Sequence, residues 1–381
     1  MRAWYHSAVE PEVVVVGGGA AGLAVAAMLR AEGVRPVVLE AEREIGAPWR
    51  ERYDRLRLHT PRGFSHLPGF PIPRDYGRWL PRDRVVNYLR EYARHHELDV
   101  RLGTRVERID RADSGWVVRT AHDELRAARV VVATGYSRIP FAPAWPGGDG
   151  FAGELIHSAD YRNAERFRGR DVLVVGTGNS GAEIAVDLAE GGAARVRVAV
   201  RTPPQIVRRS SFGIPAQLFG IALGRLPASW VGPISLTLRR LTIPDLEPYG
   251  LPRPSEHVGQ QFARTGTIPI LDVGFVEGVR RGRIEIVAAV GGFDGRDVLL
   301  VDGSRLTPDA VVAATGFRAG LEPLVGHLGV LDEAGLPRSD EPLPGLHFVG
   351  FRPTLGGMLR QFALTAPQLA REIAALTATP R

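Results

Sequence analysis

Two glycine-rich segments constrain the fold of this chain more than any other feature. They are Gly17-Gly18-Gly19-Ala20-Ala21-Gly22 and Gly176-Thr177-Gly178-Asn179-Ser180-Gly181, and each follows an apolar run and opens a helical pattern. In a strand–glycine–helix unit, the glycines permit a tight turn, let the backbone approach a pyrophosphate and allow the helix to pack on the strand. One such segment is weak evidence, because glycine-rich turns are common. Two in one chain predict two dinucleotides bound side by side, as an electron relay from a nicotinamide to a flavin requires.

The first segment has every part of a dinucleotide-binding unit. Four valines at 13–16 predict a strand buried on both faces, and residues 20–30 predict a helix whose N-terminus attracts phosphate. A second strand over 34–39 ends at Glu40, whose carboxylate is placed to bind a ribose 2′-OH and to repel a 2′-phosphate. This unit therefore suits FAD or NAD and not NADPH. The residues expected to bind it are Gly17, Gly19, Ala21, Gly22 and Glu40.

The second segment differs at the position that selects the nucleotide. Strands over 171–175 and 196–200 flank a helix over 181–189, and the second strand ends at Arg201 and Thr202. A guanidinium pairs with phosphate in a bidentate fashion and stays charged, so this unit favours NADPH over NADH. Arg208 and Arg209 follow shortly and are further candidates for the phosphate pocket. The residues expected to bind NADPH are Gly176, Gly178, Asn179, Ser180, Arg201 and Thr202.

Composition narrows the function further. The 381 residues allow two domains, and 44% hydrophobic with 24% charged residues is typical of a globular protein. The chain has no cysteine, which excludes disulfides, thiolate metal sites and the dithiol chemistry of thioredoxin-reductase-like enzymes. Lysine is also absent, and the arginines that give the net charge of +6 are scattered, so we expect no nucleic-acid partner. With no signal peptide and no uncharged run of about 18 apolar residues, we expect a cytoplasmic protein without a membrane span.

The order of the segments predicts an α/β fold with two Rossmann-like dinucleotide-binding domains, the second inserted into the first. The first domain would comprise residues 1–154 and 301–381, and the second residues 155–300. Single strands are expected over 100–109 and 310–314, and a helix over 83–97. The sequence Ala-Thr-Gly occurs at 133–135 and again at 314–316. Small residues and glycine at the end of a strand suit a crossover between domains, where the backbone passes close to a cofactor. The apolar segment 212–241 would pack on its own domain or line a channel, with a dimer or membrane contact as alternatives.

A motif between the two glycine-rich segments resembles the signature of a known family. Residues 151–161 follow the pattern Phe-x-Gly-x-x-x-His-x-x-x-Tyr, which is similar to the signature of the flavin-containing monooxygenases. Tyr161-Arg162 stands where the Baeyer–Villiger branch carries Trp-Pro, which argues against that branch. The likeness also covers residues 46–49, both Ala-Thr-Gly turns and residues 345–351. Residues 58–61 and 266–274 resemble the plant YUCCA subgroup, which usually has Leu where Thr60 stands.

The resemblance implies roles for further residues and makes no use of a metal. Trp49, Val106, Gly135 and the segment from Gly350 to Leu359 would flank FAD. His157 would support NADPH binding from the linker and would not act as a proton-transfer base. His59, Thr60 and Asn179 are the candidates for catalytic residues, and His59 and Thr60 would hydrogen-bond the flavin peroxide.

The resemblance also implies the reaction. NADPH would reduce FAD, the reduced flavin would form a C4a-(hydro)peroxyflavin with dioxygen, and one oxygen atom would pass to a small organic substrate. A keto acid suits nucleophilic attack, whereas an amine or a thioether suits electrophilic attack, and the sequence leaves both open. The alternatives are an NADPH oxidase or flavin reductase of the same fold, and a non-catalytic redox sensor, which the intact second fingerprint disfavours. Whether the chain forms a homodimer is also open.

Overall fold

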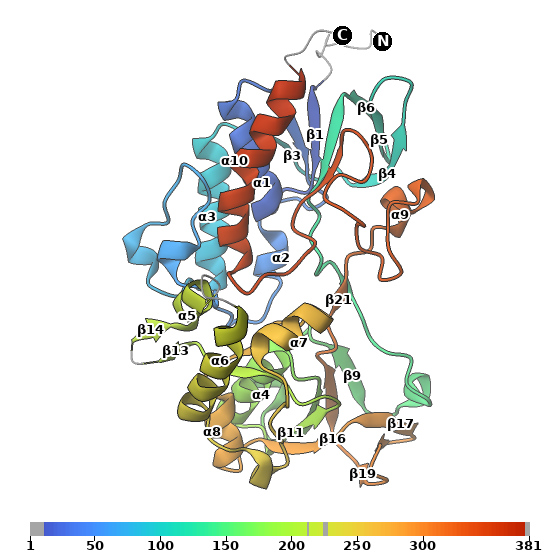
Figure 1. The fold of residues 1–381 in the computed structure, drawn as a ribbon. Coiled ribbons are helices and arrows are strands. Elements are labelled where there is room, and N and C mark those ends of the chain that lie inside the picture. Colours follow the sequence, from blue (N-terminus) through green and yellow to red (C-terminus); the bar gives the residue numbers. More distant parts are fainter. Residues whose placement is uncertain (1–10, 212, 224–227, 378–381) are drawn as a thin grey trace.

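The computed structural model describes residues 11–211, 213–223 and 228–377, and it contains two units that each have a five-stranded parallel sheet (Figure 1). The first sheet has the order β22-β7-β1-β2-β3, and the second the order β9-β20-β10-β11-β16. The first comprises β1 (Val13–Val16), β2 (Pro36–Leu39), β3 (Asp99–Arg101), β7 (Arg129–Val132) and β22 (Leu346–Phe348). The second comprises β9 (Glu154–His157), β10 (Asp171–Val175), β11 (Arg195–Val200), β16 (Glu285–Ala288) and β20 (Ala310–Ala313).

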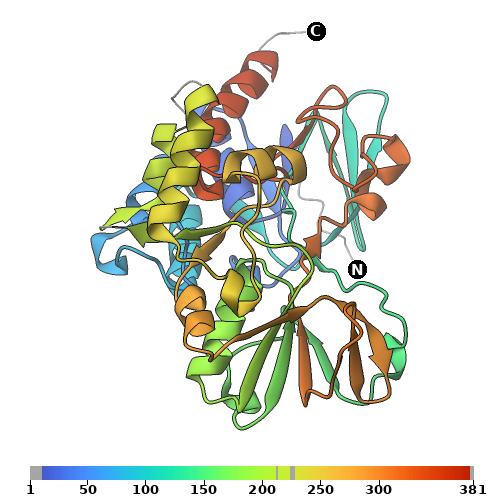
Figure 2. The same ribbon diagram turned by 60° about the horizontal axis from the view of Figure 1, so that its bottom comes forward.

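The two sheets have the same strand arrangement. The strands of the second sheet lie side by side at the bottom of Figure 2. In each sheet, the strand before the glycine turn lies at the centre, between the strand that follows its helix and a strand that ends in Ala-Thr-Gly. The central strands are buried on both faces, as their β-branched runs predict. The two Ala-Thr-Gly tripeptides therefore follow equivalent strands of two similar units.

The helices cover these sheets and join the units. They are α1 (Ala20–Ala31), α2 (Ala47–Arg50), α3 (Arg82–His95), α4 (Asn179–Glu190), α5 (Ala216–Leu223), α6 (Ala228–Thr242), α7 (Val258–Thr265), α8 (Phe275–Arg280), α9 (Glu322–Val325) and α10 (Met358–Thr377). Helices α1, α3 and α10 pack together in one core on the first sheet, so the two ends of the chain share one unit (Figure 1). No helix within the described residues has the length and apolar character to cross a membrane.

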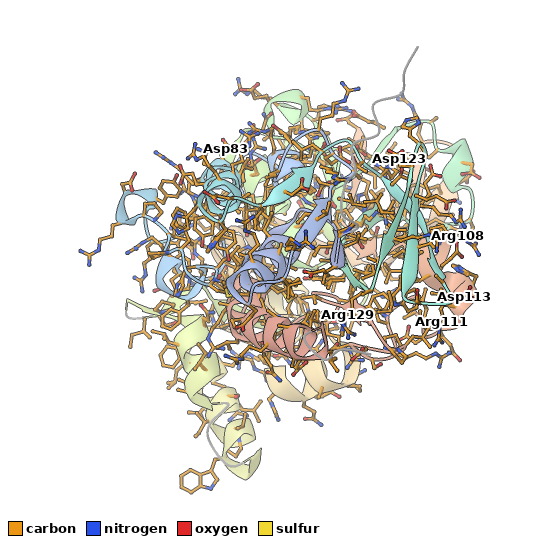
Figure 3. The ribbon with its side chains drawn as sticks, turned by 90° about the horizontal axis from the view of Figure 1, so that it is seen from above. Asp83, Arg108, Arg111, Asp113, Asp123 and Arg129 are labelled. Carbon is orange, nitrogen blue, oxygen red and sulfur yellow. The ribbon has the colours of Figure 1, made fainter. Side chains whose placement is uncertain are left out.

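Short strands form five smaller sheets. The strands are β4 (Val106–Arg111), β5 (Trp116–Thr120), β6 (Glu124–Ala127), β8 (Ile139–Pro140), β12 (Ile206–Arg208), β13 (Ser210–Ser211), β14 (Ile214–Pro215), β15 (Ile270–Asp272), β17 (Val290–Asp294), β18 (Asp297–Leu300), β19 (Arg305–Leu306) and β21 (Phe317–Arg318). Figure 3 places the labelled Arg108 and Arg111 on the β4–β5–β6 sheet, on the far side of the unit from Asp83 in the first turn of α3.

The structure corrects two boundaries expected from the sequence. The expected strand over 100–109 is two strands, β3 and β4, which belong to different sheets because the chain turns between Arg101 and Val106. The expected return to the first domain at residue 301 comes too early, because β20 pairs with β9 and β10 in the second sheet. The chain leaves the first unit after β7 and returns after β20, and these two crossings pair with each other as β8 and β21. Phe212 and residues 224–227 of the apolar segment lie outside the described residues.

Candidate active site

A cavity of about 800 Å³ extends across both units and collects most of the predicted site residues. Its wall contains parts of both glycine turns, the loop before α3, the segment after β22, and residues of α5 and α6. Described residues of the apolar segment 212–241 belong to the cavity wall, and they are Ala216, Gln217, Phe219, Gly220, Ser235, Leu238 and Arg239. The predicted site residues in this wall are Gly17, Gly19, Ala21, Glu40, Trp49, His59, Thr60, Val106, Gly135, Asn179, Ser180, Arg208, Gly350 and Leu359.

The first glycine turn has the geometry that a pyrophosphate site needs. Gly17 has φ +109°, and a Cβ there would lie 2.7 Å from the carbonyl oxygen of Ala133. A Cβ on Gly22 would overlap the carbonyl oxygen of Gly17, so the close helix–strand packing requires glycine there. A Cβ on Gly19, by contrast, would meet no atom within 4 Å. The turn is thus tight everywhere except at the backbone position that approaches the phosphates, next to the free N–H groups of α1.

Glu40 is fixed beside this turn by the backbone. Its Oε2 accepts a hydrogen bond of 2.6 Å from the N–H of Gly18, and its Oε1 accepts one of 2.8 Å from the N–H of Glu42. Each carboxylate oxygen retains a second lone pair, and Glu40 lines the cavity. The carboxylate therefore has an orientation and a remaining capacity that suit a ribose hydroxyl.

The second turn repeats the first, with a difference at Asn179. A Cβ on Gly176 would lie 2.5 Å from the carbonyl oxygen of Ala314, one on Gly181 would overlap that of Gly176, and one on Gly178 would meet open space. The amide of Asn179 is already engaged, because it donates to the carbonyl of Pro269 (3.0 Å) and accepts from the N–H of Leu271 (2.7 Å). Asn179 thus ties the start of α4 to β15, and this arrangement favours a structural role over the predicted catalytic one.

Arg201 and Thr202 are exposed at the end of β11, beside the second turn and outside the cavity wall. Among the described residues Arg201 makes no ion pair, so its guanidinium is available to an anion. Arg208 lines the cavity, and it also makes no ion pair within the described part of the chain. Arg209 lies 4.8 Å over the ring of Trp79, and burial lowers its pKa. Arg201, Arg208 and Arg209 thus lie in different surroundings and do not form one phosphate-binding cluster.

His157 is held from both sides at the end of β9. Its Nδ1 accepts a hydrogen bond from the N–H of Ala159 (3.0 Å), so Nε2 carries the proton and donates to the carbonyl of Gly316 (3.1 Å). Its ring contacts Phe317 edge-on, and burial lowers its pKa, which keeps the imidazole neutral. His157 lies outside the cavity wall. These contacts support the linker role over a role as a base.

The loop before α3 brings His59 and Thr60 to the cavity. Thr60 shares a hydrogen bond of 2.7 Å with Ser65, and Gly357 packs so closely on it that a Cβ there would lie 2.6 Å from the Thr60 methyl group. His59 pairs through Nε2 with Oε1 of Glu183 on α4, at 2.5 Å. The loop therefore contacts both the segment after β22 and the second fingerprint helix.

Sequence reasoning missed three cavity residues that the fold brings together. They are Tyr53, Gln217 and Arg52. Tyr53 belongs to the loop before α3 and is buried near Glu183, and Gln217 is a buried residue of α5. Arg52 lies 4.2 Å over the ring of Phe317. Sequence reasoning also missed Glu183 itself, which is buried beside the wall. Its only signal was its place three residues after Ser180, on the same face of the helix. No group of three or more metal-ligating side chains occurs within the residues described.

Comparisons with known proteins agree with this geometry. Residues 14–214 match the family described as pyridine nucleotide-disulphide oxidoreductase, although this chain lacks the cysteines that disulfide chemistry uses. The chain is 36% identical over 354 residues to indole-3-pyruvate monooxygenase YUCCA1 of Oryza sativa, covering 90% of this chain and 86% of that protein. The chain belongs to the flavin-containing monooxygenase family.

Two further relatives extend this result. A probable indole-3-pyruvate monooxygenase, YUCCA9 of Arabidopsis thaliana, is 37% identical over 355 residues, covering 89% of this chain and 83% of that one. The solved flavin-containing monooxygenase from Stenotrophomonas maltophilia is 25% identical with a TM-score of 0.75, covering 97% of this chain and 99% of that chain. The expected class is confirmed: the chain is an α/β flavoprotein monooxygenase that uses FAD, NADPH and dioxygen on a small molecule. The oxidase and reductase alternative is not favoured.

Proposed function

We propose that this monooxygenase acts on a 2-oxo acid with an aromatic ring, and that it converts this acid into the carboxylic acid that is one carbon shorter. The printed names of the relatives at 36% and 37% identity, which are indole-3-pyruvate monooxygenases, support this class. The cavity supports it as well, because apolar side chains such as Phe219 and Leu238 share its wall with Arg57 and Arg208. A ring suits the apolar part, and a carboxylate suits a guanidinium.

The observation that carries this proposal is the single cavity shared by the two glycine turns and the apolar helices. FAD would lie on the first unit along Gly17, Gly19 and Glu40, with its flavin toward Trp49, Val106, Gly135 and the segment from Gly350 to Leu359. NADPH would lie on the second unit, against Gly178, Ser180 and Arg201. The open spaces at Gly19 and Gly178, which are the only glycines of the two turns with no atom near a Cβ, support both assignments.

The domain arrangement follows from the same division. The FAD domain would comprise the residues up to β8 and those from β21 onward, and the NADPH domain would be the insertion between these two crossing strands. The pairing of β8 with β21 supports this arrangement, because both connections then run side by side. It replaces the boundary at residue 301 by one after β20.

When bound, the two cofactors supply hydride transfer and the activation of dioxygen. The residues of this chain would do the rest. Arg208 would hold the substrate carboxylate, the apolar wall from α5 and α6 would exclude water, and His59 and Thr60 would offer hydrogen bonds beside the reacting centre. One oxygen atom would enter the new carboxylate, the other would leave as water, the original carboxyl group would leave as carbon dioxide, and NADPH would supply two electrons.

A turnover experiment with labelled dioxygen tests the proposal. The FAD-loaded protein is mixed with NADPH, ¹⁸O₂ and, in turn, indole-3-pyruvate, phenylpyruvate, N,N-dimethylaniline and thioanisole. We expect one labelled oxygen atom in the acid formed from each 2-oxo acid, together with release of carbon dioxide. Labelled products from only the amine or the thioether would refute the substrate class. Peroxide as the sole product with every substrate would refute oxygen transfer itself. A cytoplasmic location and the absence of a nucleic-acid partner stay predictions, and the oligomeric state stays open.

A further inference from the structure

A buried carboxylate of the second unit pairs with a histidine of the first unit at the cavity wall. Oε1 of Glu183 lies 2.5 Å from Nε2 of His59. Glu183 belongs to α4, the helix that begins at the second glycine turn, and it is 4% exposed. His59 precedes Thr60 in the loop that contacts the segment after β22. This pair therefore connects the helix of one dinucleotide site with the loop of the other.

The carboxylate of Glu183 has charged and polar neighbours besides His59. Tyr53 is buried near Glu183, and burial together with the Glu183 carboxylate raises the pKa of Tyr53 well above its usual range. The guanidinium of Arg209 also lies close enough to Glu183 for an electrostatic attraction. A buried carboxylate is costly unless such partners compensate it. A carboxylate oxygen accepts hydrogen bonds, so Nε2 of His59 is the donor in its contact with Oε1 of Glu183.

The other nitrogen of His59 is available to the cavity. Within the residues that the structure describes, Nδ1 of His59 has no hydrogen-bond partner and is not enclosed by protein atoms. His59 is part of the cavity wall, together with Gly135 and Leu359 of the predicted flavin surroundings. One side of the ring is thus anchored, the other nitrogen has no partner within the described residues, and the residue belongs to the wall of the cavity.

Docking of the two units does not require this buried pair. One and two turns further along the same helix, Arg55 of the loop before α3 forms ion pairs with Asp187 (3.4 Å) and Glu190 (3.0 Å). These contacts already hold the loop against α4. An apolar pair would serve packing at least as well as a buried carboxylate and a histidine, so the pair calls for a different explanation.

We infer that Glu183 is a positioning residue for oxygen transfer: it fixes the ring of His59 so that Nδ1 accepts a hydrogen bond from an O–H group at the reacting centre in the cavity. This inference rests on the proposed function, because it assigns His59 a task in the oxygen-transfer step. Hydride transfer from NADPH to the flavin would not use this contact, because the two cofactors would supply that chemistry. Loss of Glu183 should therefore separate the two halves of the reaction.

The variant Glu183→Gln tests the inference, with Glu190→Gln as a matched control on the exposed end of the same helix. For E183Q we expect the Kd for NADP⁺ binding to the oxidised holoenzyme to stay within about twofold of the wild-type value. The change in flavin absorbance measures this Kd. We expect the same of anaerobic flavin reduction by NADPH. Oxygenated product formed per NADPH should fall about tenfold, with hydrogen peroxide in its place, because a charge-assisted hydrogen bond is lost. E190Q should match the wild type in all three measurements.

The pair can be tested as a unit with His59→Asn and the double variant. We expect H59N to lose product yield as E183Q does, and the double variant to lose no more than either single one. Losses that multiply, or an E183Q protein that couples as well as the wild type, would overturn the inference. If E183Q fails to retain FAD or unfolds at a lower temperature than E190Q, the test rests on H59N alone. An H59N protein that forms as much oxygenated product per NADPH as the wild type would then overturn the inference. A wild type that forms no oxygenated product would instead reject the proposed function.

Discussion

Arg201 stands exposed at the end of β11, and among the described residues it makes no ion pair. A 2′-phosphate bound there would gain a charge-assisted hydrogen bond, which contributes about 1.5–3 kcal/mol. We therefore predict that Arg201→Ala raises the KM for NADPH about tenfold or more and leaves the KM for NADH nearly unchanged. Steady-state NADPH and NADH oxidation measures both values.

Arg195→Ala is the matched control, because Arg195 lies on the same strand and pairs with Glu285 at 2.7 Å, away from the second glycine turn. The control should keep the nucleotide preference of the wild type. An R201A protein that still prefers NADPH as strongly as before would mean that another residue binds the 2′-phosphate.

Single histidines also give the protein a pH dependence of stability. Burial lowers the pKa of His157, His96 and His347 below the ordinary value of 6.5. The unfolded chain then binds more protons than the folded one just below this value, so the free energy of unfolding falls as the pH drops through 6.5. We predict that the Tm of the wild type decreases between about pH 7.5 and 5.5, and that His157→Gln shows a smaller decrease. Thermal unfolding at a series of pH values measures it, and His122→Gln in the exposed β5–β6 turn should change nothing. An H157Q protein with the full wild-type decrease would contradict the prediction.

At the scale of the element, the glycine turn before α1 separates folding from cofactor binding. A methyl group on Gly22 would overlap the carbonyl oxygen of Gly17, whereas one on Gly19 would lie in open space. We predict that Gly19→Ala leaves the Tm of the FAD-free protein within about 2 °C of the wild type and weakens FAD binding at least tenfold, because its methyl group occupies the approach of the pyrophosphate. Gly22→Ala should lower the Tm of the FAD-free protein itself. Thermal unfolding and FAD titration distinguish the two effects.

The second turn offers an internal control for this prediction. Gly178 and Gly181 repeat the geometry of Gly19 and Gly22, so Gly178→Ala should weaken NADP⁺ binding without weakening FAD binding. If G178A released FAD, the division of the two turns between the two cofactors would be wrong. If G19A unfolded as readily as G22A, the separation of folding from cofactor binding within the first turn would be wrong.

For the whole molecule, the sequence predicts what is local and fails where distant segments meet. Both strand–turn–helix units, the glycines and the acid at Glu40 follow from periodicity and spacing within about 30 residues. The end of the second sheet at β20 did not follow, because parallel strands pair across long insertions. Tyr53, Glu183 and Gln217 were missed for the same reason, since each acquires its role only from a partner on the other unit or after β22. The engagement of Asn179 by β15 was equally invisible in the sequence, because Leu271 lies 92 positions away.

The same long-range contacts predict that the two units unfold together. Tyr53 and Leu56 belong to the loop before α3 of the first unit, yet Tyr53 is buried in the core of the second, among Ile184, Leu188 and Ile206, and Leu56 packs against that core. A second unit without this loop would expose part of its core, so neither unit has a complete core alone. We predict one cooperative thermal transition, with equal calorimetric and van't Hoff enthalpies. Tyr53→Ala should destabilise this single transition by about 3 kcal/mol, as loss of a buried aromatic ring does. Two resolved transitions in scanning calorimetry, of which only the first responds to FAD, would show instead that the units are independent and that the loop merely rests on α4.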